Sequence, residues 1–493
     1  ILLSAPETQK AKLPAEKELL GTFQQVTARQ INPWVDRVRQ GPLVAEAPKP
    51  GRIVSESRVE ELNVTEWRLS NGVRVIMKPT DFQNDEILLT SYSPGGSSLV
   101  PDSKYLSAAF ATAVIRDAGL GRFDRITLEK ALAGKAAGVL PYIGTFEEGI
   151  RGVAAARDLE TMFQLVYLNV TAPRKDPKLF LSLLGGLEEQ LRTRVSSPEA
   201  VFADELRKAM AQGNPRQEPL SLERLQEIDF ETAYQVYRDR FADVGDFTFV
   251  LVGNFTPESI KPLVLTWLGS LPTKGRRESW RDPGDSTTFD SVVKVDVAKG
   301  LEPKSQVRML FSGPATFSRE NRHVMESLAR VLQIRLREVL REDMGAVYGV
   351  QAEGGLSSRP RGEYTFHIAF GCAPEKVDSL VQAVFAEIES IQKNGVPDGY
   401  LQKVREQERR EREVAERENR FWLGALEAYA SEGWDLRGIL RYGELVEMVT
   451  SERLQQAAQA YFHRDRYLLG VLRPEAPVPA QTAPAAVSTT TGR

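Results

Sequence analysis

The chain has 493 residues, of which 42% are hydrophobic and 27% are charged, and its formal net charge is −3. This length suggests two to four domains, and the near balance of charge excludes a broad basic surface for nucleic acid. A single cysteine, Cys372, excludes internal disulfides and metal sites built from several cysteines. No apolar run approaches the roughly 18 residues of a membrane-spanning helix, so no membrane span is expected.

Residues 1–57 are expected to connect a preceding domain to the first complete one. The opening run Ile1–Glu7 resembles Leu468–Glu475, so we interpret it as the last strand of a preceding repeat in a longer protein. From Pro6 to about Arg58, recurrent prolines indicate an extended connector whose only regular element is a helix around Glu16–Arg29. Residues 476–493, rich in Pro, Ala, Ser and Thr, are expected to be a disordered tail.

An internal repeat of about 220 residues organises the rest of the chain. Ser93 and Ser312 each lie where an apolar strand runs into a Pro/Gly turn, and they are 219 residues apart. Asp246 and Arg466, which precede two further strands after a similar aromatic and basic segment, are 220 residues apart. Two nearly equal offsets predict a pair of homologous domains, at residues 58–280 and 281–475.

The elements of each repeat follow from apolar periodicity and turn residues. In the first repeat we predict a hairpin around Asn71-Gly72, a helix ending near Gly119 with an apolar stripe at 106, 109, 110, 113 and 114, and strands Ile87–Tyr92 and Phe247–Val252. In the second we predict a helix with a stripe from Val324 to Leu340, a helix Pro374–Gln392, and strands Val347–Ala352, Tyr364–Phe370 and Tyr467–Leu472. Blocks of strands and helices favour α+β sandwich domains over strict βαβ winding.

The three histidines do not form a recognisable zinc motif within this sequence. His323 is followed by Glu326, but Ser327 occupies the position where an inverted H-x-x-E-H motif needs its second histidine. His367 alternates within a predicted strand and His463 lies in a predicted loop. We therefore interpret all three as surface or packed side chains.

Two other reactive or charged features have plain structural interpretations. Cys372 follows a glycine at a strand end without a nearby histidine, which favours a small buried residue over a nucleophile. The run Lys403–Arg417 places opposite charges three and four residues apart, which favours a solvated helix face over a partner or nucleic-acid surface.

The segment Leu340–Val350 takes the chain from a helix end, through Gly345, into a strand. Arg341 and Tyr348 then lie on consecutive elements, from which both side chains could point into one cleft. A guanidinium and a phenol are both hydrogen-bond donors, suited to a carbonyl oxygen that gains negative charge. On chemistry alone, purely structural roles for the two residues stay open.

The same segment, L-R-E-D-M-G-A-V-Y-G-V, resembles the Arg/Tyr motif of the pitrilysin (insulinase) family of zinc metallopeptidases, including its Arg-x6-Tyr spacing. The string W-R-L-S-N-G-V-R-V-I-M-K-P-T at Trp67–Thr80 resembles the start of that family's repeating domain, and the duplication fits as well. The most similar part of the family is the C-terminal half of long bacterial members, whose four α/β domains form a clamshell around a peptide chamber.

The resemblance implies a division of labour between two halves. In the family's first domain, the two histidines of H-x-x-E-H and a distal glutamate bind zinc, and the first glutamate activates water. Here the corresponding residues are Ala109–Ala113, which offer neither ligand nor base and are expected to pack as part of the apolar stripe. Zinc is therefore expected in the missing N-terminal half or in a partner subunit, and no metal ligand in this chain. Arg341 and Tyr348 are implied to contact the substrate and the transition-state oxyanion.

The resulting hypothesis is the C-terminal half of a zinc endopeptidase for peptides or unfolded segments, inactive by itself. The alternative is a non-catalytic structural or peptide-binding scaffold of the same family. By family resemblance, the periplasm or cell envelope is the expected location.

Overall fold

The computed structural model describes residues 13–30, 42–284 and 287–475. The chain divides into two units, residues 1–41 and 42–493. In the first unit helix α1 spans Glu16–Thr27, which confirms the helix predicted there. The expected strand Ile1–Glu7 and the tail at 476–493 lie outside the described residues. Over the described ranges, every helix is too short or too polar to cross a lipid bilayer.

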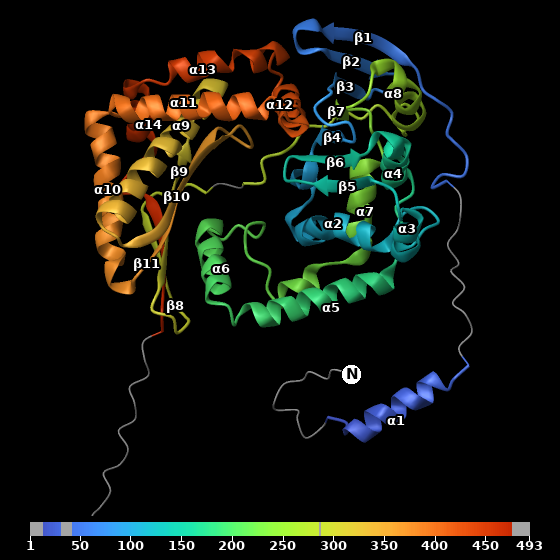
Figure 1. The fold of residues 1–493 in the computed structure, drawn as a ribbon, viewed down its shortest axis with the longest axis horizontal. Coiled ribbons are helices and arrows are strands. Elements are labelled where there is room, and N and C mark those ends of the chain that lie inside the picture. The colour runs from blue at the N-terminus through green and yellow to red at the C-terminus, as the bar shows by residue number, and fades with distance from the viewer. Residues whose placement is uncertain (1–12, 31–41, 285–286, 476–493) are drawn as a thin grey trace, which may run out of the picture. The chain divides into compact units, whose positions relative to one another are not determined.

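The N-terminal part of the second unit is built on a seven-stranded sheet with the order β1-β2-β3-β7-β4-β6-β5 (Figure 1). β2 and β3 pair antiparallel across Asn71-Gly72, which confirms the predicted hairpin, and β3 pairs parallel with β7. The strands are β1 (Ile53–Val59), β2 (Val64–Leu69), β3 (Arg74–Pro79), β4 (Ile87–Pro94), β5 (Ala137–Ile143), β6 (Glu147–Ala154) and β7 (Thr248–Gly253).

Strand β1 corrects the expectation that the N-terminal connector contains no regular element besides one helix. It pairs antiparallel with β2 at the edge of the sheet, and residues 54–58 are all exposed. Because an edge strand with both faces in water needs no apolar alternation, nothing in the pattern Val-Ser-Glu-Ser-Arg distinguishes it from a linker.

Helices cover one face of this sheet and form an extensive apolar core with it. Phe163, Phe249 and Trp267 are among its fully buried side chains. The helices of this region are α2 (Tyr105–Ala118), α3 (Arg125–Ala131), α4 (Leu159–Thr171), α5 (Pro177–Arg194), α6 (Pro198–Ala211), α7 (Phe230–Phe241) and α8 (Pro257–Leu263).

The C-terminal part is built on a five-stranded sheet with the order β10-β11-β9-β12-β8. Only β12 and β8 pair in parallel. The strands are β8 (Val292–Ala298), β9 (Ser305–Pro314), β10 (Val347–Ser357), β11 (Glu363–Cys372) and β12 (Tyr467–Arg473). The predicted strands at 347–352, 364–370 and 467–472 are thus confirmed.

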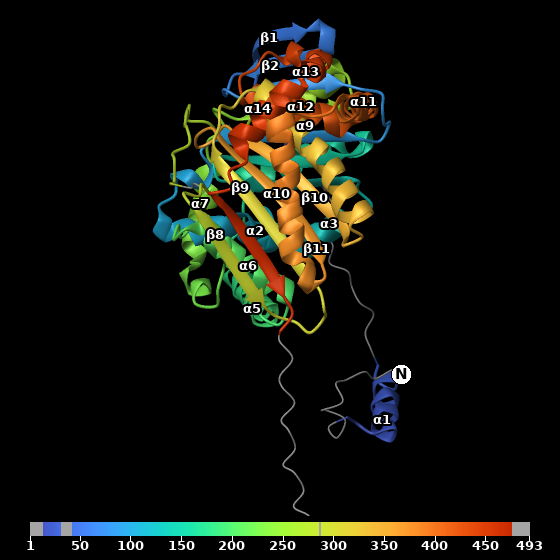
Figure 2. The same ribbon diagram turned by 90° about the vertical axis from the view of Figure 1, so that its left-hand side faces the viewer.

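Helices α9 (Arg319–Leu336), α10 (Val377–Asn394) and α14 (Ser451–Tyr461) cover one face of the five-stranded sheet (Figure 2). Leu328, Leu332 and Phe366 are completely buried between the helices and the sheet. The opposite face is free of these helices and carries polar side chains on its central strands.

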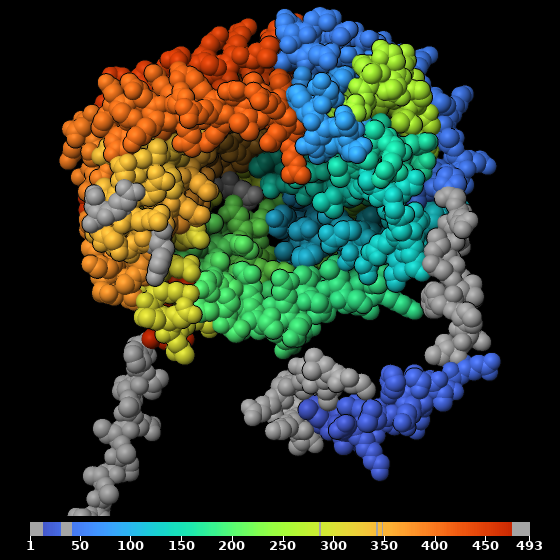
Figure 3. Space-filling model, in the orientation of Figure 1, coloured from blue at the N-terminus to red at the C-terminus, as the bar shows by residue number. Residues whose placement is uncertain are grey.

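The two sheet regions each place a helix on the other's sheet. α6, from the N-terminal region, contacts β8 and β12. α11 (Asp398–Ala415) leads into α12 (Asn419–Ser431), which contacts β4 and β7, and α13 (Tyr442–Met448) follows. Figure 3 shows the surface hollowed between the two regions, with α5 and α6 below the hollow and α11 and α12 above it.

Candidate functional site

The predicted Arg/Tyr segment begins where α9 ends. The helix continues as one π-helical segment, Arg337–Asp343, because Leu340 is fully buried and holds this turn against the core. The side chain of Arg341, the next residue, is exposed. The turn closes at Gly345, whose φ of 57° suits glycine and whose N–H donates to the Arg341 carbonyl oxygen at 3.1 Å. Arg341 is therefore held by backbone geometry at a solvent-facing turn.

Tyr348 is the second residue of β10, the edge strand that follows this turn. The flanking residues Val347 and Val350 are buried, and the pairing with β11 is irregular between them. The side chain of Tyr348 lies outside the part of the structure that is described. The structure thus places the two predicted donors on consecutive elements, and their meeting in one cleft stays a prediction.

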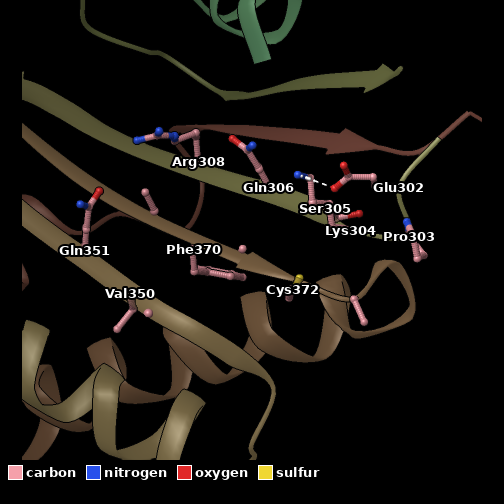
Figure 4. Close-up of a pocket in the computed structure, with 14 residues that line it drawn as sticks. Glu302, Pro303, Lys304, Ser305, Gln306, Arg308, Val350, Gln351, Phe370 and Cys372 are labelled. Carbon is pink, nitrogen blue, oxygen red and sulfur yellow. Dashed lines mark ion pairs between the residues drawn. The ribbon is translucent and has the colours of Figure 1, made fainter. Parts of the chain in front are cut away.

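A groove of about 870 Å³ begins at Gly349, directly after Tyr348, and runs over the open face of the five-stranded sheet (Figure 4). On β9 the side chains alternate, with Val307 and Met309 buried in the core while Gln306 and Arg308 line the groove. Neighbouring strands contribute Gln351, Ala369 and Gly371. Motif matching missed this groove, although the alternation of Gln306-Val307-Arg308-Met309 signals a strand with one polar face.

The charges that line the groove are unevenly compensated. Glu302 and Lys304 form an ion pair with each other at 2.7 Å. Arg308 is exposed and has no hydrogen-bond or ion-pair partner within the described residues. Cys372 is 6% exposed, and burial raises the pKa of its thiol to about 11. A thiol that stays protonated at neutral pH is a poor nucleophile, so the prediction of a small buried residue is confirmed.

The three histidines occupy separate elements. His323, on α9, is buried with its Nε2 atom 3.4 Å from an oxygen of Glu408, a residue of α11. His367 stands on the exposed side of β11, and a ring nitrogen of His463 lies 2.9 Å from the Ala460 carbonyl oxygen. Across residues 13–30, 42–284 and 287–475, no three His, Cys, Asp or Glu side chains converge to hold a metal ion. The donor set present here therefore does not fit zinc.

Helix α2 carries the residues that correspond to the family's zinc motif, but its buried face differs from the predicted stripe. Ala109 is exposed and Ala113 is half-buried, whereas Ala108, Ala111 and Ile115 pack toward the sheet. The prediction that the motif positions pack is therefore wrong at Ala109. An alanine-rich helix gives little contrast between its faces, because its small side chains suit the core and the surface equally well.

The charged run behaves as a helix surface stabilised by ion pairs, as predicted. On and just after α11, Arg410 pairs with Glu406 at 2.8 Å and Arg412 pairs with Glu416 at 2.7 Å. Glu408 is the exception, since it turns inward and is only 1% exposed.

Residues 227–408, which run from just before α7 into α11, match the family model described as "Peptidase M16 inactive domain". This region is homologous to the inactive domain of M16 peptidases. Curated relatives of the chain include "Zinc protease PQQL-like" of Arabidopsis thaliana, 27% identical over 416 residues, which are 80% of this chain and 40% of that protein. "Probable zinc protease PqqL" of Escherichia coli is 21% identical over 471 residues, 95% of this chain and 50% of that protein.

Solved M16 structures show the same fold. The crystal structure of the periplasmic protease PqqL from Escherichia coli superposes with a TM-score of 0.77 at 19% identity, covering 95% of this chain and 52% of that one. The chain thus spans about half the length, or less, of the curated relatives it matches. The resemblance to the C-terminal half of pitrilysin-type zinc peptidases and the predicted α+β fold are both confirmed.

Proposed function

We propose that this M16 chain works as the C-terminal half of a zinc-dependent endopeptidase for peptides or unfolded segments. It completes the substrate chamber and supplies Arg341 and Tyr348 as donors to the substrate carbonyl. Zinc and the water-activating glutamate come from the N-terminal half or from a homologous partner subunit. Residues 58–280 and 281–475 act as its two domains, and the complete protein works in the periplasm, where the Escherichia coli relative is described.

The exposed guanidinium of Arg341 at the turn between α9 and β10 is the observation that carries the proposal. A cation on a turn fixed by Leu340 and Gly345 can meet a substrate with little loss of its own conformational freedom. The turn leads into β10, whose Gly349 lines the groove. A peptide lying there would pass the candidate donors, and the relatives named as zinc proteases supply the class of reaction.

The two side chains have distinct roles in this proposal. The guanidinium of Arg341 places a fixed positive charge beside the carbonyl oxygen that becomes an oxyanion, and the phenol of Tyr348 donates a neutral hydrogen bond to the same region. Zinc bound in the other half would activate the attacking water. This chain holds the peptide and stabilises the charge that develops.

The test uses the complete assembly, with both halves present, and a quenched-fluorescent peptide substrate. Arg341→Gln and Tyr348→Phe should each lower kcat by about tenfold or more and change KM by less than about twofold, because donors to an oxyanion act mainly in the transition state. Arg337→Gln is the matched control, since Arg337 is an exposed arginine one turn earlier on the same π-helical segment. Its kcat should stay at the wild-type value.

Two outcomes would contradict the proposal. An unchanged kcat in both variants would make Arg341 and Tyr348 a vestigial pair. An assembly that binds peptide but shows no zinc-dependent cleavage would favour the alternative of a peptide-binding scaffold.

A further inference from the structure

We propose that the groove over β9, β11 and β10 binds the free C-terminal carboxylate of a peptide, with Arg308 as the cation that receives it. This inference deepens the proposed function and rests on it for the assumption that the ligand is a peptide. It adds Arg308 as a binding residue, a terminal carboxylate as the ligand group, and a chain direction for the bound peptide.

The donors gather at one end of the groove. In the strand register Ala369 of β11 lies between Gln351 of β10 and Arg308 of β9. A guanidinium and an amide therefore flank a position whose own side chain is only a methyl group. Figure 4 shows Arg308 and Gln351 together, at the opposite end from Glu302 and Pro303. A planar guanidinium binds a carboxylate through two parallel hydrogen bonds, and an adjacent amide N–H adds a third donor.

The charge at this end is available to a ligand. Glu302 and Lys304, at the other end, satisfy each other at 2.7 Å. Arg308 has no such partner in the described residues, so the residues that line the groove carry one positive charge without an ion pair, and Glu353 and His367 lie one step beyond them on the same face. A ligand with a single negative charge placed at that end is the electrostatic complement.

The groove is closed on β9 just beyond Arg308, which favours a chain terminus over a chain that continues. The next side chain on the same face of β9 is Leu310, which is 3% exposed. Leu206 and Met210 of α6 pack against the cluster that Leu310 forms with Leu468. Because α6 covers β8 and β12 there, a peptide that follows β9 toward Arg308 meets this contact, while His367 of β11 and Glu353 of β10 stay exposed further along the same face.

The floor leaves room for a peptide main chain. A Cβ atom added at Gly349 would meet no atom within 4 Å, and one at Gly371 would meet only the Ser305 carbonyl oxygen at 3.7 Å. A floor without side chains at these two positions suits an extended backbone that brings its own polar groups.

The test measures peptide binding to the 493-residue chain itself by fluorescence anisotropy, with no cleavage required. The probe is an eight-residue peptide of Ala, Gly, Ser and Leu, labelled at its N-terminus and made as the free acid and as the C-terminal amide. At low ionic strength the acid should bind about fivefold more tightly than the amide, the scale of one solvent-accessible ion pair. Arg308→Gln should reduce this ratio to about one and leave the affinity for the amide unchanged.

Two further variants make the result specific. Arg238→Gln removes an exposed arginine of α7 outside the groove and should keep the acid-to-amide ratio. Gly371→Leu fills the groove without changing its charge, and it should weaken binding of both peptides. A ratio of one in the wild type, or a fivefold ratio that survives Arg308→Gln, would overturn the assignment.

A third peptide distinguishes a C-terminal carboxylate from the carboxylate of a side chain. It is the amide with one internal glutamate, paired with a version carrying glutamine. Tighter binding of the glutamate version, with no preference for the free acid, would overturn the terminal assignment. Failure of the Arg341 and Tyr348 variants to affect turnover would leave this binding result untouched, so the two proposals fail separately.

Discussion

Helices α6 and α12 occupy equivalent places in the two sheet regions but make very different contacts. They begin at Pro198 and Asn419, 221 residues apart, and each lies on the sheet of the other region. α12 buries Leu426 completely against the seven-stranded sheet, in a cluster that also contains Trp422 and Tyr429. α6 buries Phe202 against β12 and otherwise reaches the five-stranded sheet through partly buried side chains such as Leu206.

Polar contacts also distinguish the α12 contact from the α6 contact. At the start of α12, Asn419 is 1% exposed, accepts a hydrogen bond from Thr80 and donates one to Glu86. Further along α12, Thr90 of β4 donates to Glu427 at 2.8 Å. The contact of α12 therefore seals the centre of its sheet, while α6 covers only β8 and β12 and leaves the groove open. Where each of two sheets carries a helix from the other region, the less complete of the two contacts leaves room for a ligand.

The largest expected effect is on the free energy of unfolding, and it comes from a substitution in the contact between α12 and the seven-stranded sheet. Leu426→Ala should lower the free energy of unfolding by about 3 kcal/mol, because it removes a fully buried side chain and leaves a cavity. The matched change on the other helix, Leu206→Ala, should cost only about 1 kcal/mol, since Leu206 is partly buried. Urea denaturation followed by circular dichroism measures both. Equal losses would mean that the two contacts are energetically alike and would remove the basis of the comparison.

A side chain inserted beneath α6 tests its contact from the side of the sheet. At Gly470 of β12 an added Cβ would come within 2.3 Å of Leu206 Cδ2 and 3.1 Å of the ring of Phe202. Gly470→Val should therefore destabilise the protein by about 1–3 kcal/mol, as overpacking usually does. Gly355→Val is the control, because an added Cβ at Gly355 on β10 meets no atom within 4 Å. The same denaturation experiment should show a change near zero for the control, and a similar loss in both variants would contradict the prediction.

Sequence patterns predicted the parts of this fold whose side chains alternate or repeat clearly. The hairpin at Asn71-Gly72 and the strand that became β11 follow from local turn and periodicity signals. Strand β1 gave no such signal, because an exposed edge strand has no buried face. The exposure of Ala109 on α2 depended on which neighbours the helix meets, which its alanine-rich sequence does not encode.

The candidate site likewise has one part that the sequence indicated and one part that only the structure revealed. The spacing of Arg341 and Tyr348 indicated a pair from the linear sequence, and the family resemblance supplied its role. Arg308 emerged only with the structure, because its significance depends on three strands that are adjacent in the sheet and on α6 closing the groove. A lone arginine in a strand carries no linear signal of being unpaired.

The smallest expected effect concerns the pH dependence of the α12 contact. Burial raises the pKa of the Glu427 carboxyl above its ordinary value of 4.5, and the nearby Glu147 acts in the same direction, while Thr90 and Arg151 oppose it. A carboxyl with a raised pKa stabilises the fold fully below its unfolded pKa, and this contribution is lost as the pH rises through the folded value. The wild-type contact should therefore weaken as the pH rises above about 4.5.

Glu427→Gln keeps an acceptor for Thr90 and removes the titrating group. The stability of the variant relative to wild type should increase from pH 4.5 to pH 8, measured as the difference in unfolding free energy at each pH. The residue 221 positions earlier is Leu206, which cannot titrate, so the α6 contact should show no such dependence. A pH-independent difference would show that Glu427 carries no raised pKa in solution. A rising difference would establish that α12, though more completely packed than α6, is the contact whose strength responds to protons.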